Sequence, residues 1–272
     1  MATVFLPPGL NALSEIDGWG VPYSEKLEVI EGVVLPGQGG TFGASGDYMV
    51  HRIAFGAWCR LGGPVVEHEL TLLRPVPLKQ SYLDDYADFS IRQIGVFLSL
   101  DETRGVVQEE RKAMEVNAEL LSSAKSLRTP IEFATERWGK FKFNRACCTW
   151  DGSGRWDRKK VRISLRSQPG EVPDAAAVAC ESLWGEEKKW MVACRDKAAA
   201  DLLPVKNSFW LQDGEAAMTE SVFRNKIKLQ SVSVGNDGTF QFWFECADLF
   251  AGHAIAIKGD LASGLAEAEI AG

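Results

Sequence analysis

One histidine of this sequence stands among carboxylates near the C-terminus. His253 lies in the segment AGHAIAIKGD, with Glu245 and Asp248 before it and Asp260 within it. An imidazole beside carboxylates could move a proton as a general acid or base, or could contribute to a metal site. A hydrolase-like enzyme that uses His253 and Asp248 is therefore one functional hypothesis.

The strand pattern around this histidine favours a structural role instead. Side chains of an extended strand alternate between two faces, so His253 shares its face with Ile255 and Ile257. An imidazole at the end of an apolar row is more often a hydrogen-bonded structural residue than a catalytic one. The sequence predicts no catalytic residue here, with the pair of His253 and Asp248 kept as the alternative.

The other histidines match no metal or cofactor motif. His51, His68 and Cys59 have separations that fit no zinc or iron pattern, and the chain has no CxxC and no HExxH sequence. The stretch GQGGTFGASG lacks the lysine and the hydroxyl residue of a phosphate-binding loop, and no serine stands in a GxSxG motif. We expect no metal and no cofactor, and a binding protein is favoured over an enzyme.

Two of the six cysteines, Cys147 and Cys148, are adjacent. Neighbouring side chains on a strand point to opposite faces, so the pair predicts one buried and one exposed thiol rather than a redox pair. The N-terminus has no signal-peptide pattern, and long chains without one rarely use disulfides. We expect no disulfide.

Charge is unevenly distributed along the chain. The formal net charge is -7 and the isoelectric point about 5.2, yet residues 137–166 hold ten basic side chains against two acidic ones. Within this segment basic residues alternate with Phe141 and with Val161, Ile163 and Leu165, so one face of two strands is apolar and the other is basic. The basic residues of that face are Lys140, Lys142, Lys160, Arg162 and Arg166.

Several roles are open for this basic face. It could bind an acidic protein partner, such as a toxin domain, by charge complementarity. It could instead be solvated, or dock on residues 1–136 of the same chain, where 19 acidic residues outnumber 11 basic ones. The acidic isoelectric point and the absence of an RNA-binding motif disfavour nucleic acid. Trp243 is a second candidate for partner binding, because strand alternation separates it from Phe242 and Phe244.

The first half predicts a strand-rich domain with one short helix. Strands are expected at 27–35, 65–73 and 88–100. Residues 36–47 hold too many glycines for a helix or a strand, whereas the composition of 109–127 predicts a helix. A boundary near 126–139 gives two domains, 1–130 and 137–272.

The second half predicts an α+β domain. Strands are expected at 140–143, 160–166, 229–234, 239–245 and 252–258. Asp151, Gly152, Ser153 and Gly154 indicate a turn between the first two strands. One helix is expected from Asp174, which would be its N-cap, and a shorter one after Thr219. The first helix would bury a stripe of Ala176, Cys180, Leu183, Trp190 and Cys194. This order predicts an antiparallel sheet with two helices on one face.

The second half also carries a family resemblance. The segments GKFKFNR and DGTFQFWFECADLFAGHAIAIKGDLASGLAEAEIAG resemble, in that order, the bacterial domain of unknown function numbered 2262. The resemblance covers about residues 139–272, and the N-terminal half resembles no family that we recognise. Because that family has no assigned catalytic residues, the resemblance implies none here.

The lack of catalytic motifs, the acidic net charge and the tryptophan-rich second half together favour a binding function. We expect a non-catalytic bacterial protein-binding module, of the immunity type that inhibits a cognate toxin. No apolar stretch reaches the length of a membrane helix, so the sequence predicts a cytoplasmic location and no membrane partner. The sequence does not determine an oligomeric state.

Overall fold

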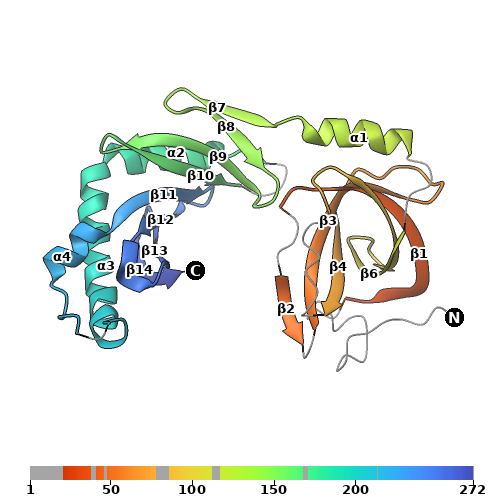
Figure 1. Cartoon of the computed structure of the whole chain (residues 1–272). Helices are drawn as coiled ribbons and strands as arrows, with labels where there is room; N and C mark the ends of the chain where they lie inside the picture. Colours follow the sequence, from red (N-terminus) through yellow and green to blue (C-terminus); the bar gives the residue numbers. More distant parts are fainter. Residues whose placement is uncertain are drawn as a thin grey trace. The chain divides into compact units, whose positions relative to one another are not determined.

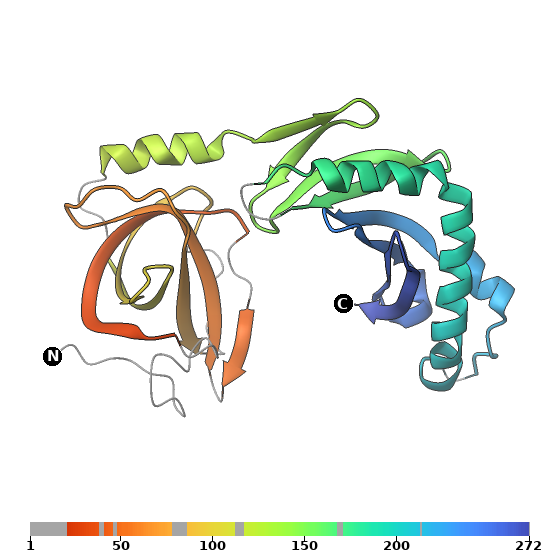
Figure 2. The same cartoon turned by 180° about the vertical axis from the view of Figure 1, so that it is seen from behind.

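The chain folds into two compact units, Met1–Pro130 and Ile131–Gly272. Figures 1 and 2 show them from opposite sides. The computed structural model describes residues 21–37, 41–45, 48–77, 86–111, 117–167, 171–212 and 214–271. The fold is mixed α+β and rich in strands.

The N-terminal unit is built around a closed barrel of five strands (Figure 1). Its strands are β1 (Tyr23–Val34), β3 (Tyr48–Arg60), β4 (Leu70–Pro77), β5 (Ile91–Ser99) and β6 (Arg104–Arg111). β1 pairs with both β3 and β5, which closes the order β1-β5-β6-β4-β3. β4 and β6 are parallel, the other barrel pairs are antiparallel, and β2 (Thr41–Ser45) pairs with the first residues of β3. Closure leaves the barrel strands without an open edge.

The barrel has an apolar interior, and helix α1 (Ala118–Arg128) packs on its outside. The interior contains the buried side chains of Ile30, Ile53, Phe55, Leu70, Leu72, Ile94 and Val96. The side chain of Asn117 caps α1 by accepting hydrogen bonds from the amides of Glu119 and Leu120. Leu120 and Ala124 of α1 then pack in a cluster with Cys59.

Three expectations for the first half are corrected by the structure. The helix expected at 109–127 starts at Ala118, because Glu109–Arg111 complete strand β6 and pair with β5. Thr41–Ser45 form strand β2 within the stretch that glycine content excluded from strands. The strand expected at 65–73 begins at Leu70. In each case pairing with another strand decides the conformation, and for β2 that partner is the next strand, β3. Composition does not encode such pairing.

The C-terminal unit is built on a mixed eight-stranded sheet, in the order β14-β13-β12-β11-β10-β9-β8-β7. Its strands are β7 (Glu132–Thr135), β8 (Gly139–Asn144), β9 (Thr149–Trp156), β10 (Lys159–Arg166), β11 (Lys228–Gly235), β12 (Thr239–Glu245), β13 (Ala254–Asp260) and β14 (Gly264–Ala271). The prediction of a purely antiparallel sheet is wrong, since β10 and β11 are parallel. A parallel pair needs a long crossover, and the helical segment between these strands provides it.

Helices cover one face of this sheet (Figure 1). They are α2 (Asp174–Gly185), α3 (Glu187–Phe209) and α4 (Glu220–Lys226), so the described residues form three helices here where two were expected. The first expected helix is broken into α2 and α3 at Glu186, but its stripe is buried as predicted. That stripe packs in one core cluster with Phe240, Phe242 and Phe244.

Strand β9 occupies the position of an expected turn. Gly152 and Gly154 lie in the strand and pair with Ile163 and Val161 of β10. A Cβ atom at Gly152 would lie 2.6 Å from the ring of Phe141, and one at Gly154 would lie 2.8 Å from the ring of Trp138. Glycine is therefore needed here because aromatic rings cover the strand closely, not because the chain turns.

No helix in the part of the chain that the structure describes is long and apolar enough to cross a membrane.

Candidate functional site

The face of the C-terminal sheet opposite the helices carries the residues that the sequence proposed for partner binding. Phe242 and Phe244 are fully buried toward the helices, so Trp243 between them lies on the other face, which we call the helix-free face. Trp243 is half-buried and is in register with Ser231 of β11 and Ala256 of β13. Small and polar neighbours thus leave part of the indole accessible.

Three cations of the helix-free face form no ion pair or side-chain hydrogen bond with the described residues. Lys142 of β8 and Lys160 and Arg162 of β10 are exposed, and no ion pair or hydrogen bond joins their side chains to the described parts of the chain. They alternate with buried Phe141, Val161 and Ile163, as predicted. Lys142 is in register with Glu132, whose pKa is lowered chiefly by Lys140 and also by the charge of Lys142. The charges of Lys160 and Arg162 are thus the more available to a partner.

The other two predicted cations are engaged within the unit. The ammonium of Lys140 lies 2.6 Å from a carboxylate oxygen of Glu132, and this hydrogen bond raises the pKa of Lys140. Arg166 donates from Nη2 to the hydroxyl of Thr239 at 3.1 Å. We call the other three, Lys142, Lys160 and Arg162, the cationic patch. Within it only Lys142 is in register with carboxylates, those of Glu132 and Asp151.

A carboxylate lies beside this patch and is held by its neighbours. Asp151 accepts hydrogen bonds from the hydroxyls of Ser164 at 2.8 Å and Thr149 at 3.0 Å. It also accepts one from the side-chain nitrogen of Asn144 at 3.0 Å. Asp151 is also in register with Lys142. These three donors satisfy much of its hydrogen-bonding capacity, so Asp151 orders the strands β8 to β10 beneath the cations.

The opposite end of the helix-free face is acidic. Lys258 of β13 bonds two carboxylates of β14, Glu267 at 3.1 Å and Glu269 at 2.7 Å, which raise its pKa. Two carboxylates around one ammonium leave a net negative charge on these strands. The face therefore runs from cationic at β8 and β10 to anionic at β14.

His253 does not join a catalytic group in the structure. It follows the 3-10 turn Ala247–Phe250, and its ring meets that of Trp210 edge-on with centroids 5.8 Å apart. Asp248 is exposed, and no hydrogen bond or ion pair between it and His253 occurs in the part of the chain that the structure describes. Trp210 packs against the core cluster, so the ring of His253 lies at the border of that cluster. The strand expected at 252–258 begins at Ala254, so His253 lies just before it.

His51 and Cys59, two other residues weighed as metal ligands, are buried. His51 is buried, with Nε2 3.1 Å from the sulfur of Met49, and burial followed by the charge of Arg74 lowers its pKa. Burial likewise raises the pKa of the Cys59 thiol, which keeps it protonated and unreactive. Within the described ranges no three His, Cys, Asp or Glu side chains gather as metal ligands.

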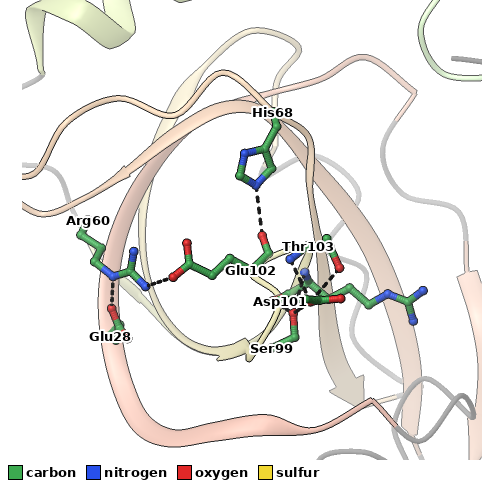
Figure 3. Close-up of polar contacts among 8 residues, drawn as sticks. Glu28, Arg60, His68, Ser99, Asp101, Glu102 and Thr103 are labelled. Atoms are coloured by element: carbon green, nitrogen blue, oxygen red, sulfur yellow. Dashed lines mark hydrogen bonds and ion pairs between the residues drawn. The ribbon is translucent and has the colours of Figure 1, made fainter. Parts of the chain in front are cut away.

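A polar network inside one end of the barrel was not predicted from the sequence (Figure 3). Arg60 donates from Nε to Glu28 at 2.5 Å and from Nη2 to Glu102 at 2.7 Å. His68 Nε2 lies 3.2 Å from the main-chain oxygen of Glu102, and its ring is edge-on to that of Trp58. The hydrogen bond from Arg60 is the main cause that lowers the pKa of Glu102. The network joins β1, β3 and the β5–β6 turn, and we assign it a structural role.

The two adjacent cysteines differ from their prediction. Both Cys147 and Cys148 are exposed, because they lie in the turn between β8 and β9 and not on a strand. The rule that neighbouring side chains alternate between faces therefore does not apply to them.

Comparison with known families agrees with the resemblance seen in the sequence. A family described as an uncharacterized protein conserved in bacteria (DUF2262) matches residues 135–270, which is half of the chain. The chain belongs to this family. The N-terminal unit has no family match outside this range, and no curated protein and no solved structure matches the chain.

Proposed function

We propose that this chain is a non-catalytic protein-binding module whose binding surface is the helix-free face of the C-terminal sheet. The observation that carries the proposal is the cationic patch of Lys142, Lys160 and Arg162, which lies on the same face as half-buried Trp243. Lys160 and Arg162 are in register with Arg155 and Ser153 and not with a carboxylate. The few residues that dominate the binding energy of protein interfaces are enriched in tryptophan, tyrosine and arginine.

The chemistry of the patch points to a partner with an acidic surface. Complementary charges raise the association rate and fix the orientation of a complex, and arginine is well suited to pair with carboxylates. The proposed partner is a toxin domain, which the module would inhibit by covering its active site, as immunity-type proteins do. Family membership supports a bacterial setting for such a pair.

A binding assay with a charge-matched control tests this proposal. The full chain is mixed with the protein encoded by the neighbouring gene, and association is followed by surface plasmon resonance at low and high salt. The test variant is Lys160→Glu/Arg162→Glu. The control is Lys188→Glu/Lys226→Glu, which changes the net charge equally on exposed residues of α3 and α4.

The test variant is expected to lower the association rate constant about tenfold or more at low salt, because electrostatic steering contributes on the order of 10 to 1000-fold. The control is expected to bind like the wild type. Equal losses in both variants would show that only net charge matters and would refute the assigned surface. The absence of any binding to the neighbouring gene product would count against the toxin partner.

A further inference from the structure

The two exposed thiols of the chain stand next to each other at the end of a hairpin. Cys147 and Cys148 close the four-residue segment between β8, which ends at Asn144, and β9, which begins at Thr149. Neither forms a disulfide, and Cys59, Cys180, Cys194 and Cys246 are buried. A reagent that needs two accessible thiols therefore meets them together only at this turn.

The turn is held in place from both sides. Phe143 pairs with Trp150 and Asn144 with Thr149 in the antiparallel register of the hairpin. The side-chain oxygen of Asn144 accepts a hydrogen bond from the amide of Ala146 at 3.1 Å, and its nitrogen donates to Asp151 at 3.0 Å. The thiol of Cys148 also lies 3.9 Å from the main-chain oxygen of Arg145, a long and weak contact. The backbone that carries both thiols is thus ordered mainly by the side chain of Asn144 and the strand pairing.

The spacing of adjacent residues disfavours a direct bond between the two sulfurs. Consecutive Cα atoms lie about 3.8 Å apart, whereas disulfides usually join Cα atoms separated by roughly 4.4 to 6.8 Å. A disulfide here would be strained. A single soft atom placed between the sulfurs enlarges the ring by one atom and lengthens the reach, so bridging through such an atom is the easier reaction.

The number and type of ligands in the turn also indicate which kind of atom would bind there. Thiolates are soft ligands that prefer soft, thiophilic centres. No third His, Cys, Asp or Glu joins the pair to form a ligand group within the residues that the structure covers, so the turn offers two sulfur ligands and no cage for a metal ion. Two thiolates match a thiophilic atom that carries two replaceable groups. Trivalent arsenic with one organic substituent is such an atom, because its two hydroxyl groups can be replaced by sulfur.

We propose that Cys147 and Cys148 together form a binding site for trivalent organoarsenicals. In the reaction an arsenical of the form R–As(OH)2 loses both hydroxyls, two S–H bonds and two As–O bonds break, and two As–S bonds form with release of two water molecules. No atom changes its oxidation state, and no other reactant is required. This site is independent of the surface proposed for protein binding.

The experiment uses phenylarsine oxide and intact-protein mass spectrometry on the reduced full chain. The wild type is expected to gain one phenylarsenic group that survives a large excess of a monothiol and is removed by a dithiol. Cys147→Ser and Cys148→Ser are each expected to lose this monothiol-resistant adduct completely. Because both residues are exposed in a turn, neither substitution should alter the circular dichroism spectrum.

Alkylation of the single variants shows whether the arsenical adduct is lost because one of its two sulfur ligands is missing or because the remaining thiol has become inaccessible. Each single variant should still react once with N-ethylmaleimide at its remaining exposed thiol under native conditions, and Cys147→Ser/Cys148→Ser should not react. A resistant adduct that persists in either single variant would overturn the proposal, because a buried cysteine would then be taking part. A wild-type adduct that the monothiol removes would also overturn it.

Discussion

Asn236 and Ala176 form a hydrogen bond that joins the β11–β12 turn to the start of α2. The side-chain oxygen of Asn236 accepts from the amide of Ala176 at 2.9 Å. The first amides of a helix have no partner within the helix, so this contact caps α2 from 60 residues away in the chain. Asp174, the N-cap expected from sequence, is instead the first residue of the helix, and Pro173 before it provides no side-chain cap.

Loss of this cap should destabilise the C-terminal unit. We expect Asn236→Ala to lower the free energy of unfolding by about 1 kcal/mol, the usual effect of removing a capping side chain. The measurement is urea unfolding followed by tryptophan fluorescence. Asn236→Asp keeps the acceptor oxygen and should lose much less, whereas an equal loss in both variants would show that the cap is not the cause.

The glycines of β9 should be intolerant of a methyl group. In Gly152→Ala the new Cβ would meet the ring of Phe141, and overpacking of this kind costs about 1 to 3 kcal/mol. Ser153 is exposed and lies on the opposite face, so Ser153→Ala should change the free energy of unfolding by less than about 0.5 kcal/mol. Thermal unfolding compares the two variants. A similar melting temperature for both would show that the ring moves away freely.

The barrel network should contribute to stability in a pH-dependent way. The hydrogen bond from Arg60 holds the pKa of Glu102 below its ordinary value of 4.5 in the folded state. The carboxylate is therefore stabilising above that ordinary value, and its contribution is lost as the pH falls through the lower folded value. The side chains of Arg60 and Glu102 are both 42% exposed, so solvent screening keeps the contribution of this ion pair to the free energy of unfolding small.

We expect Glu102→Gln to flatten the decline of the melting temperature below about pH 4.5, because the variant has no carboxylate to protonate. Differential scanning calorimetry from neutral to acidic pH provides the measurement. The variant should be less stable than the wild type at neutral pH, and the difference should shrink at acidic pH. A difference that stays constant across this range would rule out titration of Glu102 as the cause.

Trp243 should matter for binding and little for folding. If the helix-free face is the binding surface, Trp243→Ala should weaken the partner complex by about 2 kcal/mol, which is roughly 30-fold in the dissociation constant. Val192 on α3 is also apolar, is 60% exposed and lies on the helical side, so Val192→Ala is the matched control and should leave affinity unchanged. Isothermal titration calorimetry with the partner compares them. Unchanged affinity in Trp243→Ala would remove this residue from the interface.

Local alternation predicted which side chains of the candidate surface share a face. Val161, Ile163 and Leu165 are buried, while Lys160, Arg162 and Arg166 are exposed on the other side. The same rule placed Trp243 opposite Phe242 and Phe244. These predictions were correct because a strand alternates its side chains whatever its partners are.

Predictions that depended on partners were less successful. Gly152 and Gly154 indicated a turn, yet they lie in β9 because Phe141 and Trp138 cover them. Cys147 and Cys148 were placed on a strand and lie in the turn. Which strand pairs with which, and what covers a glycine, depends on segments that are distant in the chain, so a local pattern carries little information about them.

The sequence by itself determined the α+β class of the C-terminal half, its membership of a bacterial family and the two-faced character of its strands, since composition and side-chain alternation are properties of the chain alone. Only the tertiary structure decided the closure of the N-terminal barrel, the parallel pairing of β10 with β11 and the separation of paired from uncompensated cations. Hydrogen bonds and ion pairs such as those of Arg60, Lys140 and Asn236 form between residues that the fold brings together. A charge becomes available to a partner only when the fold provides it with no counter-charge, and that is why Lys160 and Arg162 could be singled out only in three dimensions.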